Sequence, residues 1–122
     1  MRRILACTLL VALTLGATAA VMTPTARATE WLHRLQTGTI DRTQLTPAVD
    51  RGLTAAVVTR LANQLGPLGD PVAMKLTETK PPVAGNTSYI FKVDFKNDST
   101  VYFIFVLDPN GKISGLRFSN AE

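Results

Sequence analysis

Apolar and polar side chains alternate along residues 88–118 in a pattern typical of three consecutive β-strands. From Tyr89 to Phe95, aromatic and aliphatic residues occupy every second position, which predicts a strand with one apolar face. From Val101 to Leu107 both faces are apolar, which favours a strand in the middle of a sheet. A third strand follows and ends near Phe118. We expect the rest of the domain to cover one face of this sheet.

The segment Asp108–Gly111 predicts a tight turn, because proline presets the backbone of a type I turn and glycine accepts a left-handed conformation. A three-residue loop, Pro109–Gly111, would place Asp108 opposite Lys112. That register puts Leu107 beside Ile113, Phe105 beside Gly115, and Phe103 beside Arg117.

The turn at Asn97–Ser99 leaves two registers open. A three-residue loop places Phe91 and the residues at 93 and 95 on the same face as Phe103 and Phe105, whereas a two-residue loop turns the first strand over. We expect the three-residue loop, because it produces one continuous apolar face.

Helical signals precede the strands. Residues 29–37 predict a short helix capped by Thr29 and ended by Gly38, with Trp31 on its apolar side and His33 roughly opposite. Thr46-Pro47 predicts a helical turn that reaches about Gly52.

A longer helix is predicted from Thr54, with an apolar stripe that runs to Leu65, and Gly66-Pro67 is expected to end it through a left-handed cap. Alternation over residues 72–76 predicts a first strand, and Lys80–Thr87 is expected to be a loop rich in proline and glycine. Helices followed by four strands indicate an α+β fold in two layers.

The first 28 residues have the pattern of a signal peptide. Arg2 and Arg3 precede an apolar run, and Ala26-Arg27-Ala28 is a small-x-small cleavage site, with an earlier cut after Ala20 as the alternative. We interpret Cys7 as an apolar residue of this segment and not as a lipid-attachment site. We therefore expect export to the periplasm or beyond, with no stable membrane span after cleavage, and one domain over residues 29–122.

Removing residues 1–28 lowers the net charge. The 122-residue chain has 13 basic and 9 acidic residues and a net charge of +4; cleavage removes three arginines and leaves +1. A nucleic-acid partner is therefore not expected. The part after Ala28 has no cysteine, so its stability in an oxidising compartment depends on packing alone.

The order of elements and several motifs resemble small secreted bacterial NTF2-like (cystatin-like) domains, which occur alone or ahead of beta-lactamase-type serine hydrolases. The residues that carry this resemblance are Trp31, Gly38, Ile40, Asp41, Arg42, Leu65–Gly69, Tyr89, Phe91, Val93 and Asp108–Leu116. The resemblance implies two or three helices packed on a four-stranded, curved antiparallel sheet. In the wider group, the sheet and helices form a cone that holds a small ligand or an active site. This chain is shorter than that group.

Catalytic signatures are weak in this sequence. It contains no G-x-S-x-G or S-x-x-K motif, and His33 is its only histidine, so we expect no catalytic residues, no metal and no cofactor. A proton-transfer enzyme would need a carboxylate inside the cone. Asp94 is predicted on the polar face of its strand, and Asp41-Arg42 is interpreted as a cap between helices.

Arg117 is the most interesting charge, because the predicted register places it on the apolar face beside Phe103, where Gly115 leaves room next to Phe105. A guanidinium there could bind a carboxylate or a phosphate, or it could extend to solvent from the end of the strand. The candidate ligand-binding residues are Arg117, Gly115, Phe103, Phe105, Trp31 and Tyr89.

Three functions compete on this evidence. The leading hypothesis is an exported, non-enzymatic module that binds a small anionic ligand or a protein partner. The second is a small NTF2-like enzyme of the isomerase or lyase type with a buried carboxylate. The third is an accessory protein of a separately encoded exported hydrolase.

Overall fold

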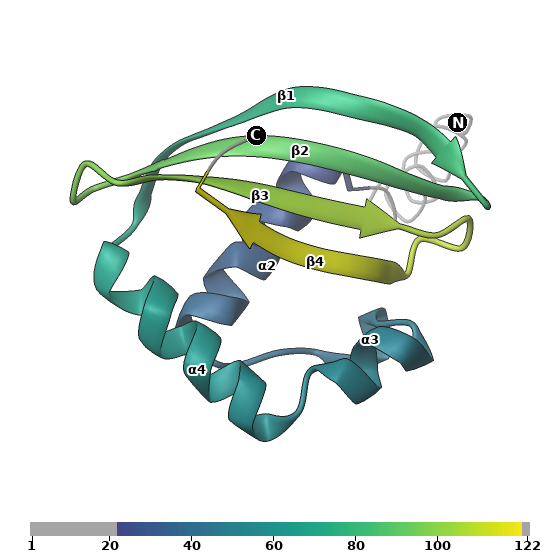
Figure 1. The fold of residues 1–122 in the computed structure, drawn as a ribbon, viewed down its shortest axis with the longest axis horizontal. Helices are drawn as coiled ribbons and strands as arrows, with labels where there is room; N and C mark the ends of the chain where they lie inside the picture. Colours follow the sequence, from purple (N-terminus) through teal and green to yellow (C-terminus); the bar gives the residue numbers. More distant parts are fainter. Residues whose placement is uncertain (1–21, 121–122) are drawn as a thin grey trace, which may run out of the picture.

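The computed structural model describes residues 22–120 and has the predicted α+β architecture (Figure 1). Helices precede a four-stranded antiparallel sheet in the order β1-β2-β3-β4 and lie together on one side of it. The elements are α2 (Pro24–Thr37), η1 (Arg42–Gln44), α3 (Pro47–Gly52), α4 (Ala55–Leu65), η2 (Gly66–Leu68), β1 (Pro71–Val83), β2 (Asn86–Phe95), β3 (Thr100–Leu107) and β4 (Ile113–Ser119).

Helix α2 begins five residues earlier than the sequence pattern predicted. Its cap is Thr23, whose side chain accepts a hydrogen bond from the backbone of Ala26, and Pro24 occupies the first turn. The predicted cap, Thr29, lies inside the helix, where its hydroxyl donates to the carbonyl of Thr25. The predicted end is confirmed, because Gly38 adopts a left-handed conformation with φ 76°.

The two later helices begin where predicted. Thr46 and Thr54 cap α3 and α4, and both hydroxyls accept from the backbone three residues later. The predicted left-handed cap at Gly66 is wrong: its φ is −56°, and the chain continues as the short helix η2. The positive φ falls at Gly69 (85°), because Pro67 fits the first turn of a new helical segment.

The segment Lys80–Thr87 is not the loop that was predicted. Strand β1 continues to Val83, and a tight turn at Ala84-Gly85, with φ 55° and 83°, leads directly into β2. Prolines 81 and 82 fit this strand because β1 lies at the edge of the sheet and, among the described strands, pairs only with β2.

The register of β2 and β3 produces the expected apolar face. Phe91 pairs with Phe103 and Val93 with Val101, so the same-face prediction is confirmed. The loop is Lys96–Asp98, one residue before the predicted one, since Phe95 donates its N–H to the carbonyl of Ser99 at 2.8 Å.

The hairpin between β3 and β4 starts as predicted and then changes register. Asp108 donates its N–H to the carbonyl of Lys112 at 2.9 Å, and Leu107 pairs with Ile113, so the loop Pro109–Gly111 is confirmed. A β-bulge then inserts Ser114. Beyond it, Gly115 pairs with Val106, Leu116 with Phe105, Arg117 with Ile104, and Phe118 with Phe103.

The predicted neighbours Phe105–Gly115 and Phe103–Arg117 are therefore wrong. One extra residue moves every later side chain of β4 to the opposite face. Leu116 and Phe118 now face the core, and Phe118 stacks on Phe103 with ring centroids 4.6 Å apart. The bulge thus avoids burying the charge of Arg117, which is exposed.

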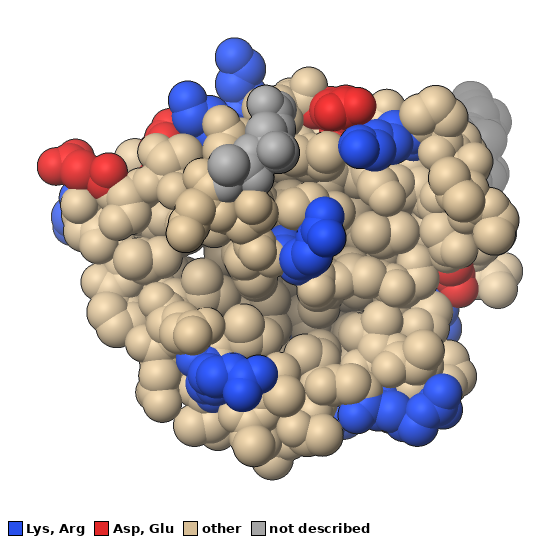
Figure 2. Space-filling model, viewed as in Figure 1, with Lys and Arg blue, Asp and Glu red and all other residues tan. Residues whose placement is uncertain are grey.

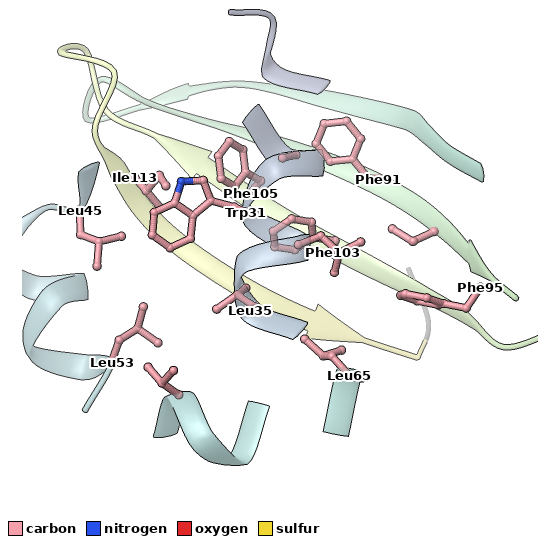
Figure 3. Packing of buried hydrophobic residues seen from close by; sticks show 14 residues of the cluster. Trp31, Leu35, Leu45, Leu53, Leu65, Phe91, Phe95, Phe103, Phe105 and Ile113 are labelled. Atoms are coloured by element: carbon pink, nitrogen blue, oxygen red, sulfur yellow. The ribbon is translucent and has the colours of Figure 1, made fainter. Parts of the chain in front are cut away.

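The core lies between the helices and the inner face of the sheet (Figure 3). Trp31 of α2 lies over β3, the strand that carries both Phe103 and Phe105, and all three side chains are fully buried. The other buried members are Ala28, Leu32, Leu35, Leu45, Leu53, Val58, Leu65, Phe91, Val93, Phe95 and Ile113.

The predicted signal segment is described only in part, since residues 1–21 lie outside the described range. The predicted cleavage site Ala26–Ala28 falls inside α2. There Ala28 is fully buried, and the Arg27 guanidinium donates to the carbonyl of Gly111 and to Gln44. Within residues 22–120, no helix has the length and apolarity needed to cross a membrane.

Candidate functional site

A groove of about 530 Å³ runs along the outer edge of β4, between that strand and helices α3 and α4. Its lining is mainly apolar, which is typical of a binding site more than of a solvated crevice. The residues that line it are Val49, Gly52, Leu53, Val57, Leu61, Gln64, Gly115, Leu116, Arg117 and Phe118.

The strand wall of the groove is the edge of the sheet itself. Four consecutive residues, Gly115–Phe118, line it. Because successive side chains of a strand point to opposite faces, a wall that touches all four exposes the backbone between them. Strand β4 ends the sheet, so every second residue along this edge directs its N–H and C=O toward the groove.

The helical wall is one row of side chains on α4. Val57, Leu61 and Gln64 are four and three residues apart, so they lie one above the other on a single helix face. The half-buried Val57 and Leu61 also contact the core, which ties the groove to the interior. Val49 and Leu53 close the groove at its α3 end.

Polar contacts away from the groove hold these walls in place. Arg42 donates to the carboxylate of Asp50 at 2.7 Å and to the carbonyl of Leu53 at 2.7 Å, which fixes α3 against the preceding segment. At the other end, the amide of Gln36 donates to the carbonyls of Leu65 and Gly69 and so fixes the end of α4 to α2.

Basic side chains surround the groove. Arg117 lines it. Arg60 lies on α4 beside the lining row, three residues after Val57 and four before Gln64. Arg51 immediately precedes Gly52, which lines the α3 end. All three are exposed, and none of their guanidinium groups forms an ion pair or a hydrogen bond with another residue of the described range 22–120. Figure 2 shows basic side chains around the recessed area between β4 and the helices, with acidic ones nearer the outline.

A second hollow, of about 480 Å³, continues the groove past Phe118 and Gln64, which line both. Its other residues include Ser99, Thr100 and Asn120, so this end is more polar. An elongated partner would therefore meet an apolar segment first and a polar segment beyond it.

The structure separates the six residues predicted as a site. Gly115 and Arg117 line the groove, although on the face of β4 opposite to the one expected. Phe103, Phe105 and Trp31 are fully buried in the core, and Trp31 donates its indole N–H to Gln44 at 2.9 Å. Tyr89 pairs with Phe105 and is half-buried against the core.

Sequence reasoning missed most of the groove's apolar lining. Leu116 and Phe118 were not proposed, although their alternation with Arg117 was a signal that the two kinds of residue face opposite ways. Val57 and Leu61 were assigned to the core stripe, and the sequence offered no sign that this edge of the stripe would remain partly open.

The carboxylates predicted as alternatives lie elsewhere. Asp94 is on the outer face of β2 and accepts from the hydroxyl of Thr100 at 2.7 Å. Asp41 caps η1, and hydrogen bonds from the side chains of Thr43 and Gln44 and from the backbone of Thr43 hold the pKa of that carboxyl below its usual value. Among residues 22–120, no charged side chain is buried, and no three potential metal ligands cluster.

No relative emerges from comparison with known proteins. No family model, curated protein or solved structure matches this chain. The resemblance to NTF2-like domains remains a sequence-based interpretation.

Proposed function

We propose that this chain is an exported, non-enzymatic binding module and that its site is the groove between β4 and helices α3 and α4. The partner presents an apolar segment and at least one carboxylate. The observation that carries the proposal is the combination of an apolar lining with three exposed arginines around it.

The three arginines favour an anionic partner because no carboxylate of the described residues pairs with them. The nearest acidic residue of α3, Asp50, already pairs with Arg42 at 2.7 Å, so its charge is compensated away from the groove. A guanidinium can bind a carboxylate through two parallel hydrogen bonds. The predicted signal segment supports export.

The enzyme hypothesis gains no support from the geometry. It requires a carboxylate in an apolar environment, where burial would raise its pKa enough for proton transfer. The groove lining contains neither aspartate nor glutamate, and Asp94 lies on the opposite face of the sheet.

Decanoate is a suitable first probe, since it combines an apolar chain with one carboxylate. We expect it to shift the amide resonances of Leu61, Leu116 and Arg117 in an NMR titration. Leu61→Gln and Arg117→Met should each weaken binding by about tenfold, as expected for the loss of one buried apolar contact or one charged hydrogen bond.

Control variants exist on α4 and on the outer face of the sheet. Thr59→Gln changes an exposed residue on the opposite side of α4, and Lys92→Met removes an exposed cation from the outer face of β2. Both should bind decanoate as the parent does. Equal weakening by these controls, or shifts confined to other surfaces, would show that the groove is not the site.

A further inference from the structure

We infer that the groove recognises an extended acidic peptide segment, which adds to β4 as a fifth strand. This inference rests on the proposed function and names the partner of the same site. Peptides that extend a sheet obtain affinity from main-chain hydrogen bonds and specificity from pockets for alternate side chains. The groove of this chain offers both.

The two edges of the sheet differ in how they are protected. Strand β1 carries Pro81 and Pro82, Lys75 and Lys80, and its pairing with β2 has three irregularities. Prolines, lysines and bulges are the features by which proteins prevent edge-to-edge pairing. Along Gly115–Phe118, β4 has no proline, no lysine and a regular register with β3. The β4 edge is therefore the one that accepts a strand.

The chain itself begins such a pairing at the start of β4. Leu45 forms a parallel bridge with Ile113, and Thr46 donates its N–H to the carbonyl of Ile113 at 3.0 Å. The chain then turns away into α3 at Pro47. Within the described residues, no strand pairs with the outer edge of Gly115–Phe118. A fifth strand could therefore continue along β4 from the bridge at Ile113.

The dimensions of the groove fit an extended segment. Four strand residues span about 13 Å, and the helix row from Val57 to Gln64 spans about 10 Å. A peptide of about four residues would therefore pair with Gly115–Phe118 and direct alternate side chains onto Val57 and Leu61. The more polar hollow beyond Phe118 would hold the residues that follow.

Charge distinguishes a peptide partner from a second copy of this chain. Antiparallel pairing of two β4 strands about a two-fold axis would bring Arg117 of each copy close to the other, and like charges across a strand pair are unfavourable. Glutamate or aspartate at the alternate positions of a foreign strand that point away from α4 would instead lie on the face of the sheet that carries Arg117.

The test compares three peptides of about eight residues, the length needed to cover both hollows. The first alternates glutamate with valine, the second alternates lysine with valine, and the third is the first with N-methyl groups on alternate amides. We expect the acidic peptide to bind in fluorescence polarisation and to bind about tenfold or more weakly when N-methylated, because methylation removes donors of the strand ladder.

Charge-reversed variants test the charge preference without altering the apolar lining of the groove. Arg117→Glu should transfer binding from the acidic to the basic peptide, whereas Lys75→Glu on β1 should change neither. Equal binding of the N-methylated peptide would overturn strand addition, and equal binding of the basic peptide would overturn the acidic preference.

Three further outcomes bear on this inference and on the proposed function. If decanoate binds in the groove but no peptide does, strand addition is wrong and the binding module stands. If sedimentation shows a dimer and hydrogen exchange shows that residues 115–118 are protected in it, the occupant is a second copy and the peptide inference is overturned. If neither decanoate nor peptide binds, both proposals fail.

Discussion

The indole N–H of Trp31 donates a hydrogen bond of 2.9 Å to the side-chain oxygen of Gln44. The same oxygen accepts from Arg27 at 3.0 Å, and the amide nitrogen of Gln44 donates to Asp41 at 3.0 Å. One amide thus connects α2 with η1. The segment after η1 forms the bridge to Ile113 and leads into α3, so this contact helps to place one end of the groove.

Gln44→Ala should reduce the free energy of unfolding by about 1–3 kcal/mol, because it leaves the indole N–H of the fully buried Trp31 without its acceptor. Urea unfolding followed by tryptophan fluorescence measures this loss. Gln64→Ala is the control, since Gln64 is exposed, and it should change stability by about 0.5 kcal/mol or less. Similar losses in both variants would mean that the Trp31–Gln44 contact contributes nothing specific.

Asp41 predicts a pH dependence of stability. Hydrogen bonds from Thr43 and Gln44 lower the pKa of Asp41 in the folded chain. Its contribution is therefore complete above the pKa of the unfolded chain, about 3.9, and is lost as the pH falls through the folded value. Asp41→Asn should be less stable than the parent at neutral pH, and the gap should narrow in acid. Urea midpoints at neutral and acidic pH test this, and a gap that widens in acid would contradict it.

The bulge at Ser114 makes a prediction about Gly115. A Cβ atom added at Gly115 would lie 3.0 Å from Cγ2 of Val106, so Gly115→Ala should cost about 1–2 kcal/mol. Val106→Ala removes Cγ2 but keeps the Cβ of residue 106, which would lie 3.2 Å from the added atom, so Gly115→Ala should cost less in the Val106→Ala background without becoming neutral. If the predicted register without a bulge were correct, the two substitutions would be additive.

The β3–β4 hairpin shows what local sequence can and cannot specify. The loop was predictable because Pro109 and Gly111 fit a single turn geometry, and Gly111 indeed has φ 82°. The bulge was not, because Ser114 is compatible with either register and only the burial of Leu116 and Phe118 against Phe103 and Phe105 selects between them. Because the bulge moves Gly115 and Arg117 to the other face of β4, it also separates them from Phe103 and Phe105, the other predicted site residues.

The extent of β1 was also unpredictable from local sequence, because it depends on the position of this strand at the edge of the sheet. Pro81 and Pro82 predict a loop when the sequence is considered alone, yet an edge strand tolerates them, and that position is a property of the whole sheet. The groove could not be predicted for the same reason. Its two walls lie about fifty residues apart in the chain, and only the packed fold places α4 beside the edge of β4.

The start of α2 bears on the predicted cleavage of the signal segment. A chain beginning at Thr29 lacks the cap at Thr23, both contacts of Arg27 and the buried Ala28. We expect residues 29–122 to be less stable than residues 21–122 by about 2 kcal/mol or more, as lost caps and buried hydrogen bonds indicate. Urea unfolding of the two chains measures this difference.

If the chain is exported as proposed, we therefore expect cleavage after Ala20, the alternative site, and not after Ala28. N-terminal sequencing of secreted material should begin at Val21. A start at Thr29, together with unchanged stability of the shorter chain, would show that the first turns of α2 are dispensable.

Hydrogen exchange along β4 tests the central claim most directly, because a fifth strand must protect backbone amides that otherwise face the groove. With the alternating glutamate–valine peptide present, exchange should slow in the segment 115–118, while the segment 75–80 of the opposite edge strand should be unaffected. The N-methylated peptide should leave both segments unchanged. Protection of 75–80 instead, or peptide binding with no protection of 115–118, would contradict recognition by strand addition at β4.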